Sequence, residues 1–231
     1  NLMTTKNILV LGSGPQIKIT KKEFNKIYAS NASIFKCKDY LNDNKNLEII
    51  SVVTEESLLS DIPTQTNIKE AKPHRIIIRK RTDKKLNDLN FKYSSNFLNQ
   101  VEQHNFQKKF FMFGKFLVPI SELFYGNSLR QKCRHIINII KYNKSPLGIS
   151  TGFFAILFAL LENPTSKIFL NGISMQNSDH FYKLLGKEDK IMTRHKVDNF
   201  MIKFLLKKYK KQLYSNDINL AKIARINYFE I

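Results

Sequence analysis

The sequence predicts an α/β fold: a mostly parallel sheet with helices on both of its faces. The first observation is that the opening third of the chain alternates strand-like apolar runs with helix-like stretches. Strand, helix and strand within about thirty residues form a βαβ unit, whose strands are parallel. The second observation is size, because 231 residues, 42% of them hydrophobic, suffice for one such domain with a substantial core.

Short apolar runs bounded by turn residues predict the strands. These runs are Ile8–Leu11, Ser33–Cys37, Glu48–Val53, Arg75–Ile78, Lys109–Phe113 and residues 167–172 (KIFLNG). A capping box at residues 20–23 and apolar periods of 3.6 residues predict the helices. We expect helices over about Thr20–Ala29, Ser128–Tyr142, residues 153–163, Asp198–Leu213 and Asn219–Arg225.

Three segments have a distinctive composition. Residues 153–163 (FFAILFALLEN) are apolar almost all round, which predicts a buried helix. Residues 80–108 are polar and weakly patterned, so we interpret them as a surface excursion with one short helix, within a single domain over residues 1–231. The helix over about Ser128–Tyr142 has one apolar stripe, formed by Leu129, Cys133, Ile136, Ile137 and Ile140.

The chain is strongly basic. Lysine and arginine outnumber aspartate and glutamate by 38 to 19, which gives a formal net charge of +19. Such an excess predicts an anionic partner: nucleic acid, an acidic membrane surface or an anionic substrate. The lysines are scattered and no aromatic-rich binding motif is present, which disfavours nucleic acid. The basic stretch FLLKKYKKQLY (residues 204–214) would suit an anionic leaflet, or it is a solvated helix face.

The cysteines and the apolar runs bear on the cellular location. Cys37 and Cys133 match no metal-ligand spacing. Two free thiols in a reducing cytoplasm are expected, with a disulfide between them as the alternative. No apolar run approaches the roughly 20 residues that span a bilayer. We therefore expect a cytoplasmic protein, either soluble or attached to the surface of the inner membrane.

A glycine-rich turn follows the first predicted strand. In ILVLGSGPQI (residues 8–17), a buried strand runs directly into Gly12-Ser13-Gly14-Pro15. Turns of this kind often hold a phosphate. This one is not a P-loop, because no Gly-Lys-Ser/Thr follows, and it lacks the third glycine and the acidic residue of a dinucleotide site. A ligand-binding loop and a simple tight turn both stay open.

A second candidate lies where the buried helix begins. Ser150, Thr151 and Gly152 precede its apolar run. The free N–H groups of a first helical turn suit an anion or a ribose, and two hydroxyls would add to such a site. Plain N-capping by Ser150 or Thr151 is the alternative.

Two histidines follow polar, loop-like residues: His180 in NSDHFY and His195 in TRHKVDN. A neutral imidazole is the usual base that takes a proton from a sugar hydroxyl. Surface histidines that cap helices are the alternative. We interpret His74, His104 and His135 as structural. No cluster has metal-ligand spacing, so no metal site is predicted.

Taken in order, four segments resemble motifs of the sialyltransferase family of the animal type (glycosyltransferase family 29) and its bacterial relatives that use CMP-activated acidic sugars. LVLGSGPQI with SNASIFKCKDY (residues 30–40) resembles the long motif, and residues 148–174 (GISTGFFAILFALLENPTSKIFLNGIS) resemble the short motif. His180-Phe181-Tyr182 resembles the third motif. The segment from His195 resembles the last, with Phe200 where the family has glutamate, and Ser13 stands where the family has asparagine.

The resemblance implies a Rossmann-like domain that transfers an acidic sugar from a CMP donor with inversion, without a metal or a further cofactor. His180 and Tyr182 would contact the phosphate, and His195 would take the proton from the acceptor hydroxyl. The acceptor would be a glycan or a lipid-linked oligosaccharide, such as the inner core of a lipopolysaccharide. The residues implied to line the nucleotide are Gly12, Ser13, Gly14, Pro15, Asn31, Ser150, Thr151, Gly152, Asn171 and Gly172.

Several alternatives stay open at this point. The donor sugar is sialic acid, Kdo or a related acid, and neither acceptor nor linkage is defined. The net charge keeps a nucleic-acid-binding protein in view. The changes at Ser13 and Phe200 keep a catalytically inactive relative in view.

Overall fold

The computed structural model describes residues 6–14, 20, 22–41, 44, 46–80, 94–110, 128–142, 149–173, 198 and 209–230. This part of the chain forms one sheet of eight strands in the order β5-β4-β3-β2-β1-β6-β7-β8. Every strand pairing is parallel. The predicted α/β class with a parallel sheet is therefore confirmed.

The elements follow the chain in this order. The strands are β1 (Asn7–Leu11), β2 (Lys26–Ser30), β3 (Glu48–Thr54), β4 (Arg75–Arg79), β5 (Ser94–Leu98), β6 (Lys167–Asn171), β7 (Leu213–Ser215) and β8 (Asn227–Tyr228). The helices are η1 (Asn31–Lys36), α1 (Cys37–Leu41), α2 (Glu55–Ser60), α3 (Ile62–Ala71), α4 (Gln100–Lys108), α6 (Leu129–Tyr142), α7 (Thr151–Glu162) and α9 (Ile218–Ala224).

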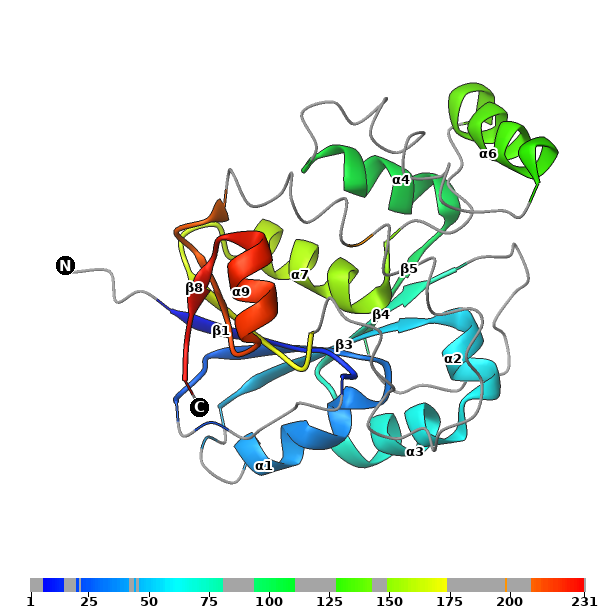
Figure 1. Cartoon of the computed structure of the whole chain (residues 1–231). Helices are drawn as coiled ribbons and strands as arrows, with labels where there is room; N and C mark the ends of the chain where they lie inside the picture. Colours follow the sequence, from blue (N-terminus) through cyan, green and yellow to red (C-terminus); the bar gives the residue numbers. More distant parts are fainter. Residues whose placement is uncertain are drawn as a thin grey trace.

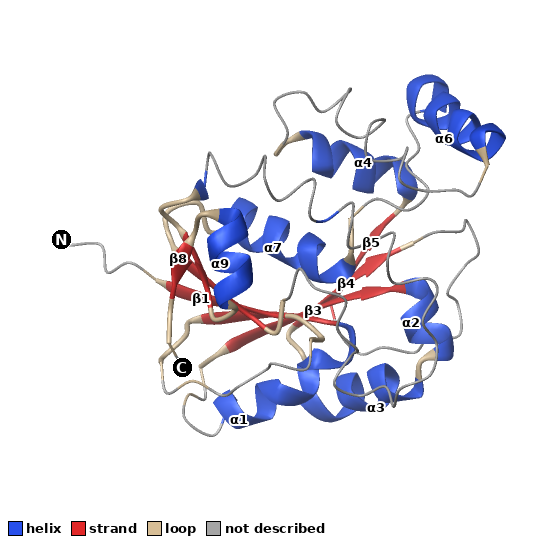
Figure 2. Ribbon diagram, in the orientation of Figure 1, coloured by secondary structure: helices blue, strands red, loops and turns tan. Residues whose placement is uncertain are grey.

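Helices cover both faces of the sheet, as Figures 1 and 2 show. Alternate residues of each strand enter one of two cores, because successive side chains of a strand point to opposite faces. Ile8 and Val10 of β1 join the core under α4, α7 and α9. Leu9 and Leu11 join the core over α1, α2 and α3. The helices on both faces predicted from the sequence are thus confirmed.

Helix α7 lies at the centre of one core. Its residues are buried on almost every side, as its apolar composition predicts. Phe154 and Phe158 of this helix pack against Phe106 of α4, with ring centroids 4.9 and 4.3 Å from it. The helix crosses β1, β2 and β3, so it packs on the central strands of this face of the sheet (Figure 2).

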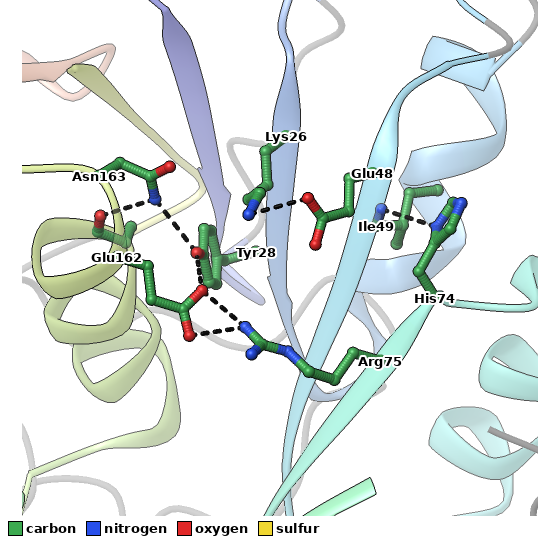
Figure 3. Close-up of polar contacts among 9 residues, drawn as sticks. Lys26, Tyr28, Glu48, Ile49, His74, Arg75, Glu162 and Asn163 are labelled. Atoms are coloured by element: carbon green, nitrogen blue, oxygen red, sulfur yellow. Dashed lines mark hydrogen bonds and ion pairs between the residues drawn. The ribbon is translucent and has the colours of Figure 1, made fainter. Parts of the chain in front are cut away.

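A polar cluster holds the carboxyl end of α7 near the amino ends of the strands (Figure 3). Tyr28 Oη donates to Glu162 Oε2 at 2.5 Å, and Arg75 Nη2 donates to both Glu162 oxygens at 2.6 and 2.7 Å. Asn163 Nδ2 donates to Tyr28 Oη at 3.1 Å. His74 Nδ1 accepts from Ile49 N at 3.1 Å, which supports its structural interpretation. The cluster fixes α7 from its far end, so the amino end of α7 lies at the opposite edge of the sheet.

Two predictions for residues 20–37 are wrong. The Thr20–Glu23 capping signal predicts a helix up to Ala29, but Lys26–Ser30 is the strand β2. Ser33–Cys37, predicted as a strand, belongs to η1 and the start of α1. The reason is burial, because Ile27, Tyr28 and Ala29 are completely buried in a strand that pairs with β1 on one side and β3 on the other. Pairing on both sides outweighs the local capping signal.

The middle and the end of the chain also differ from expectation. Within the predicted surface excursion, α4 is the expected short helix. Ser94–Leu98, however, is a strand at the edge of the sheet beside β4, and its sequence contains only two apolar residues that would indicate a strand. Lys109 and Phe110 form a turn, not a strand, and residues 111–113 lie outside the described part. Leu213 begins β7 instead of ending a helix. Of that predicted helix, Asp198 is helical and residues 199–208 are not described.

Alkaline pH is expected to destabilise the fold. Cys37 and Cys133 are both free thiols, the first buried and the second exposed. Burial raises the pKa of the Cys37 thiol, and burial with the neighbouring Glu162 raises the pKa of Tyr28. In the unfolded chain these groups lose protons from about pH 8.5 and pH 10, respectively. The stability they contribute is therefore complete below about pH 8.5 and falls as pH rises, by about 1.4 kcal/mol per unit and group.

Urea unfolding between about pH 7 and pH 10 measures this loss. Cys37→Ala should weaken the pH dependence that begins near pH 8.5, whereas Cys133→Ala, on the surface, should leave it unchanged. Stability that stays constant over this range would contradict the prediction.

Candidate functional site

The strand order reverses between β1 and β6. Strands β2 to β5 follow on one side of β1, whereas β6 lies on its other side. In open parallel sheets, ligands bind in the crevice at the carboxyl ends of the strands where the order reverses. Gly12-Ser13-Gly14 follows β1, and Asn171 and Gly172 end and follow β6. The glycine-rich turn of the sequence therefore lies at this reversal point.

The two loops at the reversal point are in direct backbone contact. Gly12 N donates to Asn171 O, and Gly14 N donates to Gly172 O, both at 2.8 Å. A Cβ on Gly14 would lie 2.7 Å from Gly172 O, and one on Gly12 would overlap the same oxygen. Gly172 has a left-handed φ of 68°. These glycines permit the close approach of the two loops, which supports the tight-turn interpretation without excluding a ligand above it.

Hydroxyl groups tie the turn to the end of β2. Ser13 is buried, and its Oγ donates to Ser30 O at 3.1 Å. Ser30 Oγ and Ser33 Oγ both donate to Leu11 O, at 3.1 and 2.9 Å. Because a hydroxyl has a single hydrogen, Ser13 can only accept a further hydrogen bond from a ligand.

Asn31 follows β2 directly and has a left-handed φ of 50°. Its Oδ1 is buried and has no hydrogen-bond partner among the described residues. A buried acceptor without a partner costs about 1–3 kcal/mol. The Asn31 side chain is therefore suited to accept a hydrogen bond from an N–H group of a bound molecule. As predicted from the sequence, Asn31 lies at the carboxyl edge of the sheet.

The amino end of α7 lies over the end of β2. Ser150 caps this helix, because its Oγ accepts from Phe153 N at 3.2 Å. A Cβ on Gly152 would be 3.7 Å from Ser30 Oγ, an ordinary contact. The amide groups of Thr151 and Gly152 belong to the first turn, where N–H groups have no intrahelical partner. The capping interpretation is confirmed, and it leaves these donors at the crevice.

Two charged residues at this helix end were missed as site residues. Asp198 Oδ1 accepts from Ser150 N at 2.9 Å, which joins Asp198 to the start of α7. Arg79 ends β4 and is buried; its Nη2 donates to Ile149 O at 2.8 Å and its Nη1 to Thr151 Oγ1 at 3.3 Å. The signal for Arg79 was a charge at the carboxyl end of a strand whose three central residues are apolar, RIIIR.

Arg79 holds the start of α7 in place, so its loss should be severe. Its guanidinium lies 4.4 Å above the Phe154 ring and its Nε donates to Gln103 Oε1 at 3.2 Å. Arg79→Met leaves these buried acceptors without their donor and is expected to lower the free energy of unfolding by about 3 kcal/mol. Urea unfolding measures this, and Arg130→Met, at an exposed position, is the control. Equal stabilities of the two variants would refute the role.

The structure brings most of the predicted nucleotide-lining residues to one edge. The backbone of Asn171 lies at this edge, but its side chain is engaged elsewhere: Asn171 Oδ1 accepts a hydrogen bond from Asn216 Nδ2 at 2.9 Å, which connects the end of β6 to the segment after β7. Pro15, His180, Tyr182 and His195 lie outside the described residues. The residues found together are Gly12, Ser13, Gly14, Asn31, Ser150, Thr151, Gly152, Asn171 and Gly172.

The described part of the chain, taken as a whole, contains no group of three or more His, Cys, Asp or Glu side chains that could hold a metal ion. Among the helices in this part of the chain, none is long and apolar enough to cross a membrane.

Comparison with known proteins gives a likeness in structure alone. No protein-family model matches the chain, and no curated protein matches it. A crystal structure of a single-residue variant of the sialyltransferase CST-II in complex with CMP matches with a TM-score of 0.51 and 16% identity, over 96% of this chain and 86% of that one. The sialyltransferase CstII from Campylobacter jejuni with cytidine-5'-monophosphate matches with a TM-score of 0.49 and 17% identity, over 96% and 84%.

The likeness supports a sialyltransferase-like fold, as the sequence motifs imply. Membership of the animal-type family stays a prediction. At 16% identity, what the chain shares with CST-II is the arrangement of its strands and helices.

Proposed function

We propose that the protein is a glycosyltransferase that moves an acidic sugar of the sialic acid or Kdo type from a CMP donor to a hydroxyl of a glycan or glycolipid. The observation that supports this best is the meeting of four separate segments at the reversal point of the sheet. The turn after β1, Asn31, the start of α7 and the end of β6 meet there. The similar CST-II structure is a complex with CMP.

The polar groups at the crevice suit a cytidine nucleotide. The unpaired Asn31 Oδ1 would accept from the amino group of cytosine. At the start of α7 the carboxylate of Asp198 and the guanidinium of Arg79 offset each other, so the first-turn N–H groups would bind the ribose hydroxyls through hydrogen bonds. The phosphate would then lie towards His180 and Tyr182, whose motif implies contacts with it.

The chemistry would proceed by inversion. The acceptor oxygen attacks the anomeric carbon, His195 takes the proton of that hydroxyl, and the bonding electrons leave with the phosphate of CMP. Hydrogen bonds from His180 and Tyr182 would stabilise the departing charge without a metal. Asp198, three residues after His195, contacts the start of α7, which supports the presence of this motif at the crevice.

Release of CMP from a panel of nucleotide sugars tests the proposal. CMP-sialic acid and CMP-Kdo are the substrates, with CDP- and UDP-sugars as controls. We expect slow release from one CMP-sugar without an acceptor, faster release with one, and no effect of EDTA. If no CMP-sugar is hydrolysed and CMP causes no thermal shift, the proposal is wrong.

The same assay separates the alternatives. A thermal shift with CMP but no turnover would indicate an inactive relative, in keeping with a Ser13 hydroxyl whose hydrogen is already donated to Ser30 O. The net charge of +19 favours a nucleic-acid-binding protein as the second candidate. Strongly salt-dependent binding to random DNA, with no response to CMP, would support that candidate.

We further propose a cytoplasmic location, in keeping with two free cysteines, for a bacterial enzyme of lipopolysaccharide or capsule synthesis.

A further inference from the structure

Four of the five side chains in the apolar stripe of α6 are exposed, and the fifth, Ile136, is half-buried. Leu129, Ile137 and Ile140 are 77%, 54% and 73% exposed, and Cys133 between them is exposed as well. In Figure 1, α6 stands at the periphery of the molecule, outside the layers that cover the sheet. The periodicity that predicts this stripe usually marks the face of a helix that packs on a core. Here the stripe faces away from both cores, and exposed apolar stripes of this kind mark interaction surfaces.

Positive charges flank the stripe. At 100° per residue, Arg130 and Arg134 lie along one side of it and Lys132 along the other. Residues 129–142 include no aspartate or glutamate. Long cationic side chains beside an apolar stripe can reach outwards to anionic groups while their stems cover apolar surface. The helix thus combines the two features of an interfacial amphipathic helix.

We propose that α6 docks on an anionic membrane surface, with its apolar stripe in the headgroup region. The basic residues would lie against lipid phosphates, where each cation strengthens binding about fivefold. This surface differs from residues 204–214, the stretch that the sequence singled out for a membrane.

A second copy of the chain fits the same surface less well. Two such helices in contact would bring basic residues together with no carboxylate on either helix, between chains of net charge +19. The exposed stripe comprises four side chains, whereas stable interfaces bury about 800 Å² on each partner. Charge complementarity therefore favours lipid.

Docking through α6 would also bring the crevice close to the bilayer. Tyr142 and Ser150 are eight residues apart in the sequence, which spans at most about 28 Å of extended chain. The start of α7 consequently stays within that distance of the end of α6. If the proposed function holds, a lipid-linked acceptor would lie within reach.

A fluorescent label tests the contact directly. Cys133 lies in the stripe and is exposed, whereas Cys37 is buried, so an environment-sensitive thiol dye reacts at one position. With vesicles that contain phosphatidylglycerol, we expect the emission of the dye to shift to the blue. Vesicles of phosphatidylcholine alone should produce little shift. Equal shifts with both vesicles, or none with either, would overturn the proposal.

Vesicle co-sedimentation of two pairs of variants completes the test. Leu129→Ser with Ile140→Ser should weaken binding about tenfold or more, with unchanged thermal unfolding. Arg130→Gln with Arg134→Gln should weaken it about twenty-five-fold. The matched controls are Leu59→Ser with Ile62→Ser, also exposed apolar positions, and Lys69→Gln with Lys222→Gln. Binding that falls equally in the controls would overturn the proposal.

Sedimentation velocity without vesicles tests whether a second copy of the chain binds α6 instead. If the Leu129→Ser/Ile140→Ser variant converts an oligomer into a monomer, a second copy covers α6 and the lipid proposal is wrong. CMP release in solution should be equal in this variant and in the unaltered protein, so failure of the docking and failure of the proposed transfer remain distinguishable.

Discussion

Replacing His195 by alanine is expected to reduce acceptor-dependent CMP release about a hundredfold or more, the usual effect of losing a general base. The reason is that the acceptor hydroxyl is a poor nucleophile until its proton is removed. Donor binding should change little, because the imidazole would act on the acceptor. Initial rates and the thermal shift with CMP measure the two effects separately.

His74→Ala is the control for this variant. His74 accepts a hydrogen bond from Ile49 N far from the crevice, so its loss should cost about 1 kcal/mol of stability and leave the rate unchanged. A His195→Ala variant that retains the full rate would place the base on another residue. The transfer itself would still be supported by release from a CMP-sugar.

Gly12→Ala is expected to lower the free energy of unfolding by about 3 kcal/mol or more. The new Cβ would overlap the carbonyl oxygen of Gly172 and lie 2.6 Å from the Ile173 side chain. Relief requires the loops after β1 and β6 to separate, which would break the hydrogen bonds from Gly12 N to Asn171 O and from Gly14 N to Gly172 O. Urea unfolding gives the change.

Gly152→Ala is the matched substitution. Its Cβ would meet only Ser30 Oγ at 3.7 Å, and alanine favours a helix over glycine by up to about 1 kcal/mol. This variant should therefore be as stable as the unaltered protein or more so. If the start of α7 holds the nucleotide, the same methyl group should weaken CMP binding. Wild-type stability in Gly12→Ala would contradict the close packing of the two loops.

Local patterns determined much of this protein. The buried strands β1, β3, β4 and β6 and the buried helix α7 follow from apolar runs whose environment is apolar on every side. The Ser150 cap and the glycine turn follow from side-chain chemistry that acts within a few residues. Because these signals are short in range, one sequence suffices to identify them.

Tertiary structure decided the features that depend on distant segments. Strand β2 exists because β1 and β3 enclose it, against a local signal for a helix. The Asn171 side chain serves Asn216 rather than the crevice, and Arg79 meets Thr151 across 72 positions of the sequence. A parallel sheet aligns the carboxyl ends of strands that are far apart in the chain. Most candidate site residues were therefore visible in the sequence, whereas Arg79, Asp198 and the partner of each side chain were determined by the order of the strands.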